Sequence, residues 1–141
     1  MESNEKFEDT EAWGKARELA KIIYQATALG QLPQDRVLQE ELRRVTLAVM
    51  VHIARSFESV DEKEYFNSIT LTAQFITELK TQLYVAKDID LLTESQFEQL
   101  YVLAMEIRQA LKNIRKPGNI PNRPVGDYAP DYESRIRSFL K

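Results

Sequence analysis

The residues able to carry acid–base or metal chemistry are few. His52 is the only histidine and cysteine is absent, which excludes thiolate nucleophiles and zinc–thiolate centres. A di-iron site in a helical bundle needs a Glu-x-x-His pair on each of two helices, but Val49 stands three residues before His52. A lone histidine beside Val45 and Ala48 is more often a hydrogen-bonded boundary residue than a base or ligand. We expect no catalytic residue, and an enzymatic hypothesis would depend on His52 alone.

One segment imitates the start of a calcium loop. In "DIDLLTESQFEQ", residues 88–99, the sixth position is Thr93 where a calcium loop has glycine, and the twelfth is Gln99 where it has glutamate. Asp88 and Asp90 are therefore predicted to lie in a link between helices. The four glycines are scattered, so no phosphate-binding loop is present. We expect no metal ligand and no cofactor.

The composition is that of a soluble globular protein. The chain has 141 residues, of which 43% are hydrophobic and 29% charged. This length is sufficient for one domain with a hydrophobic core. The formal net charge of -3 gives no overall positive field that would attract nucleic acid. The polar N-terminus does not resemble a secretory signal, and the apolar run 45–54 is too short to cross a membrane. A cytoplasmic protein without a membrane partner is expected.

Apolar residues at 3-4 spacing predict helices that must position any functional group. The expected helices run over 9–29, 34–57, 59–87 and 93–116. Asp9 or Thr10 would cap the first, and the last two open with predicted capping boxes, Ser59 with Glu62 and Thr93 with Gln96. Four helices of similar length with short links predict an all-α, antiparallel up-down-up-down four-helix bundle.

The expected organisation is a bundle with two extensions. Residues 1–8 form a polar N-terminal extension, 9–116 the bundle, and 117–141 a flexible arm rich in proline and glycine. The end of the arm could form a short helix with one apolar side, which would dock on another subunit or on a partner protein. Its apolar residues are Tyr132, Ile136, Phe139 and Leu140. A disordered tail is the alternative.

The second predicted helix has apolar residues on the side away from its core positions. They are Leu47, Met50, Val51 and Ala54. In a monomer they would form an exposed patch, and such patches usually mark interfaces. We predict a subunit interface here, the alternative being that a loop or the arm covers it.

Two groups of cations are candidates for binding phosphate or a partner. Arg43, Arg44 and Arg55 frame the apolar patch, where they could also pair with neighbouring glutamates. Arg108, Lys112, Arg115 and Lys116 gather at the end of the fourth predicted helix. Cations there also complement the helix dipole, so ordinary stabilisation is the alternative to a nucleic-acid patch.

The sequence resembles a known family along most of the bundle. "FEDTEAWGKARELAKIIY" is similar to the opening of the four-helix proteins encoded in intervening sequences of bacterial 23S rRNA genes, and "LRRVTLAVMVHIA" and "ELKTQLYVA" are similar to later stretches. The resemblance implies a bundle that assembles into a ring-like homo-oligomer, typically a pentamer, with no known enzymatic activity. Related proteins of diversity-generating retroelements bind reverse transcriptase and nucleic acid.

These observations predict a non-catalytic, self-associating helical scaffold or adaptor, with a homopentamer favoured. The alternative is an RNA-binding or reverse-transcriptase-associated accessory protein that uses the local basic patch. The sequence names no partner beyond the chain itself.

Overall fold

The computed structural model describes residues 6–28 and 36–117, and over these residues the chain is helical without strands. The helices are α1 (Glu11–Ala26), α2 (Arg36–Phe57), α3 (Glu62–Asp88) and α4 (Glu94–Ala110), with short 3-10 turns η2 (Phe7–Asp9) and η4 (Leu111–Asn113). The prediction of an all-helical chain with four α-helices is confirmed over these residues. None of the helices in this part of the chain is long and apolar enough to cross a membrane.

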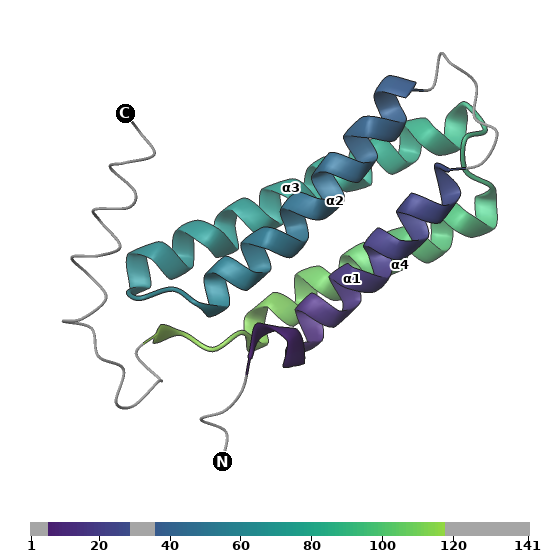
Figure 1. Ribbon diagram of the computed structural model, residues 1–141. Coiled ribbons are helices and arrows are strands. Elements are labelled where there is room, and N and C mark those ends of the chain that lie inside the picture. The colour runs from purple at the N-terminus through teal and green to yellow at the C-terminus, as the bar shows by residue number, and fades with distance from the viewer. Residues whose placement is uncertain (1–5, 29–35, 118–141) are drawn as a thin grey trace.

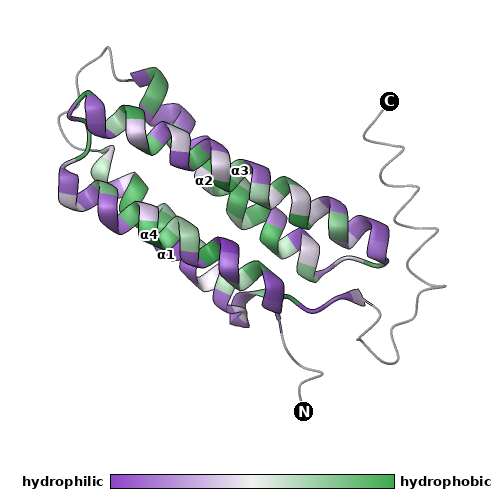
Figure 2. Cartoon of the chain, turned by 180° about the vertical axis from the view of Figure 1, so that it is seen from behind, coloured by the Kyte–Doolittle hydropathy of each residue, from purple (hydrophilic) through white to green (hydrophobic). Residues whose placement is uncertain are grey.

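The helices lie as two neighbouring pairs. Figure 1 shows α2 beside α3 and α1 beside α4, and contacts between α1 and α2 and between α3 and α4 join the pairs. Hydrophobic and hydrophilic residues alternate along every helix in Figure 2, as expected of helices with one buried side. The core takes fully buried side chains from each helix, among them Leu19, Leu42, Leu79 and Ile107. Burying one such side chain contributes about 1.5–3 kcal/mol.

Two helix starts follow the sequence prediction. Thr10 caps α1, since its Oγ1 accepts a hydrogen bond from the backbone N–H of Trp13 at 3.3 Å. Thr93 and Gln96 form the predicted capping box of α4, with reciprocal bonds of 2.9 and 3.0 Å. Each cap satisfies a backbone donor that the first turn of a helix leaves open.

The predicted cap of α3 is wrong. Asp61 caps this helix by accepting from the N–H of Glu64 at 2.8 Å, and the Glu64 carboxylate accepts from the N–H of Val60. The Ser59 hydroxyl instead donates to the carbonyl of Arg55 at 2.9 Å. It therefore closes the end of α2, and α3 begins at Glu62, three residues later than predicted.

The link between α3 and α4 is a compact turn. Asp90 adopts the left-handed conformation, φ 64°, that glycine usually takes after a helix. The N–H of Leu91 bonds to the carbonyl of Ala86 at 2.9 Å, and the N–H of Asp90 to that of Lys87 at 3.0 Å. This pair of bonds ends α3. Asp90 lies in the link as predicted, whereas the prediction is wrong for Asp88, which is the last residue of α3.

The fourth helix is shorter than predicted. It ends at Ala110 rather than Lys116, and the 3-10 turn η4 follows. The chain after η4 is held by Tyr65, whose hydroxyl donates to the carbonyl of Ile114 at 2.9 Å in a buried position. Ile114 itself has extended backbone, so Arg115 and Lys116 lie beyond the helix.

The predicted extensions are only partly described. Phe7, assigned to the N-terminal extension, packs edge-on against Trp13 with ring centroids 5.2 Å apart, so this residue joins the bundle. Pro117 is buried. Residues 29–35, which complete the link between α1 and α2, lie outside the described residues, and so do the predicted docking residues of the arm. They are Tyr132, Ile136, Phe139 and Leu140.

Candidate functional site

His52 is placed as a packing residue between α2 and α3. Its ring is half-buried and stacks on Phe75, with centroids 5.3 Å apart and planes 10° from parallel. The buried Nδ1 atom has no hydrogen-bond partner among the described residues. Burial, and secondarily the charge of Arg55, lower the pKa of His52 below its usual 6.5, so the ring is neutral at pH 7. In the described part of the chain no group of three or more acidic or histidine side chains could hold a metal ion.

Replacing His52 with phenylalanine is expected to remove one pH dependence of folding while keeping the stack on Phe75. Because the pKa of His52 is lower in the folded chain than its usual 6.5, the unfolded chain takes up the proton first as the pH falls. The free energy of unfolding is therefore highest above pH 6.5 and decreases below it. The effect is expected to be below about 1 kcal/mol, since the ring is partly solvated.

Urea unfolding of both proteins at pH 7.5 and pH 5.5 checks this expectation. Between these values Glu41 stays ionised, because the hydrogen bond from Arg44 lowers its pKa below 4.5. An equal loss of stability in the wild type and in His52→Phe would contradict the assigned role of the imidazole.

The predicted interface residues on α2 differ in exposure. Leu47 and Val51 are 44% and 49% exposed. Met50 and Ala54 are half-buried, and Met50 packs against the core. Met50 lies two helical turns after Arg43, so both residues are on the same side of α2. This side faces α1, because Arg43 donates a hydrogen bond to the backbone carbonyl of Tyr24. The neighbouring helix therefore covers part of the predicted patch, and Leu47 and Val51 remain open.

Helix α3 extends this apolar surface, which sequence reasoning missed. Arg44 on α2 bonds to Glu78 on α3 at 3.1 Å, so these residues mark where the outer sides of the two helices meet. Leu71 and Val85 lie seven residues before and after Glu78 and share its side of α3. We define the α2/α3 apolar face as six exposed side chains: Val37, Leu47, Val51, Leu71, Val85 and Ile89.

Arg44 is held in ion pairs within the subunit. Its guanidinium lies 2.9 Å from a Glu41 oxygen and 3.1 Å from a Glu78 oxygen. The hydrogen bond from Arg44 lowers the pKa of Glu41, and the same bond raises the pKa of Arg44. The two carboxylates neutralise the guanidinium beside Leu47 and leave one negative charge on the network, so Arg44 offers no free positive charge on the α2/α3 apolar face.

The other predicted cations are dispersed. Arg43 bonds to Thr27 Oγ1 at 2.8 Å and lies over the ring of Tyr24 at 4.5 Å, which ties α2 to the end of α1. Arg115 lies over the ring of Phe57, at the other end of α2. Fourteen residues of helix separate Arg43 from Phe57, about 21 Å at 1.5 Å per residue.

The remaining predicted cations lie toward the end of α4. Arg108 is exposed on α4 and Lys112 on η4, and Lys116 lies over the ring of Phe66 at 5.2 Å. Arg55 is exposed in the last turn of α2. The predicted patch therefore divides into Arg43 and Arg44 at one end of the bundle and the other cations toward the opposite end.

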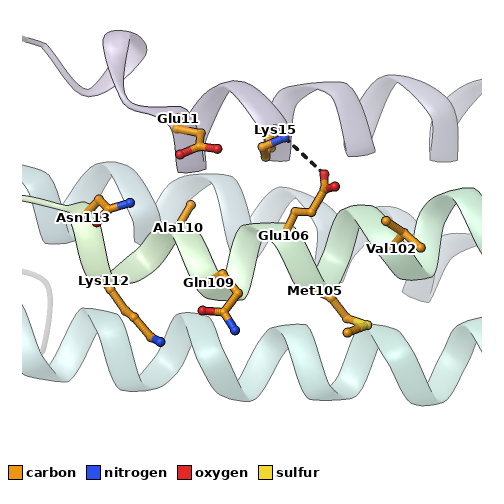
Figure 3. Close-up of a pocket in the computed structure, with 9 residues that line it drawn as sticks. All are labelled: Glu11, Lys15, Val102, Met105, Glu106, Gln109, Ala110, Lys112 and Asn113. Atoms are coloured by element: carbon orange, nitrogen blue, oxygen red, sulfur yellow. Dashed lines mark hydrogen bonds and ion pairs between the residues drawn. The ribbon is translucent and has the colours of Figure 1, made fainter.

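A shallow groove of about 620 Å³ runs along α1 and α4. Lys15 and Glu106 point toward each other across it in Figure 3 and form an ion pair of 3.1 Å. That hydrogen bond raises the pKa of Lys15. Met105, Gln109 and Lys112 project from the other side of α4 in the same view. Because the polar groups do not converge on one point, the groove lacks the usual form of a small-molecule site.

Comparison with known proteins gives a family and a fold. The family described as 23S rRNA-intervening sequence protein matches residues 8–113. No curated protein matches the chain. The chain is similar to a crystal structure of a protein with unknown function from the S23 ribosomal protein family of Bacteroides thetaiotaomicron. The TM-score is 0.64 at 17% sequence identity, over 81% of this chain and 97% of the other. At this identity the likeness concerns the fold alone.

Proposed function

Because the chain belongs to the family of 23S rRNA-intervening sequence proteins, as its sequence resemblance predicted, we propose that it is a non-catalytic, self-associating helical scaffold or adaptor of the cytoplasm. The observation that carries the proposal is the α2/α3 apolar face. Its six members are exposed, and they account for more than half of the exposed large hydrophobic side chains among the described residues. Apolar faces of this kind usually serve as interfaces.

The proposed subunit is an antiparallel up-down-up-down bundle that carries the C-terminal arm. Short turns after α2 and α3 return the chain along its own direction, and each helix contacts its neighbours in sequence. The ring-like form and the favoured homopentamer come from the family resemblance. When each subunit binds the next through two different faces, the subunits form a closed ring if the rotation between neighbours divides a full turn evenly.

Light scattering in line with size exclusion on the untagged protein tests self-association. A mass several times the 16.4 kDa of one chain supports the proposal. A monomeric mass across the accessible concentration range would overturn it. Absorbance at 260 and 280 nm in the same run reports any nucleic acid carried through purification.

The arm is proposed to dock on a neighbouring subunit or on a partner protein through its apolar residues. Deleting residues 118–141 is expected to lower the assembly mass or to abolish capture of that partner. The cut leaves Pro117, which is buried against the bundle. An unchanged mass together with unchanged partner capture would contradict a docking role.

A second candidate function is that of a nucleic-acid or reverse-transcriptase accessory protein. The observation in its favour is that Arg108 and Lys112 are exposed and make no ion pair with a described residue. A ring would present these cations once per subunit and so raise the avidity for nucleic acid, although each chain has a net negative charge. Co-purified nucleic acid that dissociates at high salt would favour this candidate over a purely structural scaffold.

A further inference from the structure

The side of the bundle formed by α3 and α4 carries exposed aromatic rings beside cations. The rings of Tyr84, Phe97 and Tyr101 form one cluster, with centroids 4.9 to 5.7 Å apart. Lys87 lies 4.5 Å from the Phe97 centroid, and Lys80 lies 5.2 Å from that of Tyr101. Tyr84 is 48% exposed. The cluster therefore reaches solvent through Tyr84, while Phe97 anchors it in the core.

A second aromatic group lies on the same side, toward the end of α4. Phe66 is 48% exposed, with Lys116 5.2 Å from its ring centroid. Between the two groups lie Tyr101, Met105 and Arg108 on α4 and Lys112 on η4, at spacings of four, three and four residues that place them along one side of the helical segment. From Tyr101 to Lys112 this row spans about 17 Å at 1.5 Å per residue.

Acidic residues are absent from the rows between Phe66 and Lys87 and between Tyr101 and Lys112, and exposed carboxylates stand only at the ends of the rows, at Glu62, Asp88 and Glu94. On α3 the row from Phe66 to Lys87 continues through Ala73, Thr77, Lys80 and Tyr84. The side of α4 that faces α1 carries Glu106, which lines a groove with Glu11 of α1; Met105 and Lys112 form the border between this groove and the surface of α3 and α4. A chain of net charge -3 thus gathers cations on one side. We name this surface the α3/α4 strip: Phe66, Lys80, Tyr84, Lys87, Tyr101, Met105, Arg108, Lys112 and Lys116.

We propose that the α3/α4 strip binds single-stranded nucleic acid, with phosphates on Lys80, Arg108, Lys112 and Lys116 and unpaired bases stacked on Tyr84 and Phe66. A cationic row beside exposed rings is the arrangement that tracks a single strand, because every base offers a face for stacking. A duplex hides those faces, and the Asp and Glu side chains of an acidic peptide offer no ring that could stack on Tyr84 or Phe66. This inference rests on the second candidate function and does not require self-association.

The strip lies apart from the proposed subunit interface. Its members on α3 share the side of that helix that contacts α4, whereas Leu71 and Val85 flank the contact with α2. Association through the α2/α3 apolar face would leave the strip open in each subunit. A strand could then contact successive subunits of one assembly, which would increase its avidity.

Fluorescence anisotropy with a labelled twelve-nucleotide oligouridine and the full chain tests the proposal. The salt dependence, log Kobs against log[KCl], is expected to have a slope of about -3, from four phosphate contacts at roughly -0.7 each. Replacing Lys80, Arg108 and Lys112 with glutamine should make that slope shallower by about 2. Tyr84→Ala should weaken binding about 5- to 100-fold through lost stacking, with the slope unchanged.

A matched control removes the same charge elsewhere. Arg17, Lys21 and Arg36 are exposed and lie outside both the strip and the predicted basic patch, and their replacement with glutamine should leave the slope near that of the wild type. Circular dichroism and light scattering establish that each variant keeps its helix content and assembly mass.

The possible outcomes distinguish an error in the assigned α3/α4 strip from an error in the second candidate function. Wild-type protein that does not bind oligouridine at low salt overturns both the strip and the second candidate function. Binding that survives in the strip variants but is lost in the control variant overturns the strip alone. If oligoglutamate of equal charge competed as effectively as unlabelled oligouridine, the assignment of nucleic acid as the ligand would be overturned.

Discussion

Replacing Leu47 and Val51 together with glutamate is expected to convert the assembly into single chains of 16.4 kDa. Both side chains are exposed in the subunit, at 44% and 49%, so the carboxylates remain in water when the subunit stands alone. In the assembly they would lie against apolar groups of a neighbour, where an unpaired charge is costly. The substitution therefore opposes association far more than folding.

Light scattering measures this change directly, and circular dichroism checks that the helices are retained. The matched control places glutamate at Val102 and Met105, which are also about half exposed but lie on α4. The control variant should keep the wild-type mass. If the control variant dissociated while the Leu47 and Val51 variant kept the wild-type mass, the interface would be assigned to α4 instead of to α2 and α3.

Replacing Ile107 with alanine is expected to cause the largest loss of folding stability among these variants. Ile107 is fully buried on α4, and removing a large aliphatic side chain from a packed core costs about 2–5 kcal/mol. Domains of this size have total stabilities of about 5–15 kcal/mol, so a large part of the stability would be lost.

Urea unfolding at one fixed protein concentration measures this loss, because association would otherwise shift the apparent stability. Val102→Ala on the same helix is the control. Its side chain is exposed, and a surface substitution usually changes stability by less than about 0.5 kcal/mol. A loss below about 1 kcal/mol for Ile107→Ala would contradict close packing of α4 on the rest of the bundle.

Local signals predicted most of the helical architecture. Thr93 and Gln96 are three residues apart, and their capping box requires no distant partner. Ser59 and Glu62 have the same spacing, yet Asp61 caps α3. The two positions compete within a few residues, and the hydroxyl of Ser59 is already used by the carbonyl of Arg55. A pattern of residue types does not decide which of two adjacent caps forms.

The sequence by itself determined the helices and the buried side of each, because backbone hydrogen bonds and apolar spacing act over three or four residues. It also determined the family, through residues spread along the bundle. The roles of the cations were decided only by the tertiary structure. Arg44 pairs with Glu78, 34 residues away, whereas Arg108 on α4 and Lys112 on η4 stay exposed. Which charges are neutralised and which stay open depends on helix packing, and that packing brings together groups that are far apart in the chain.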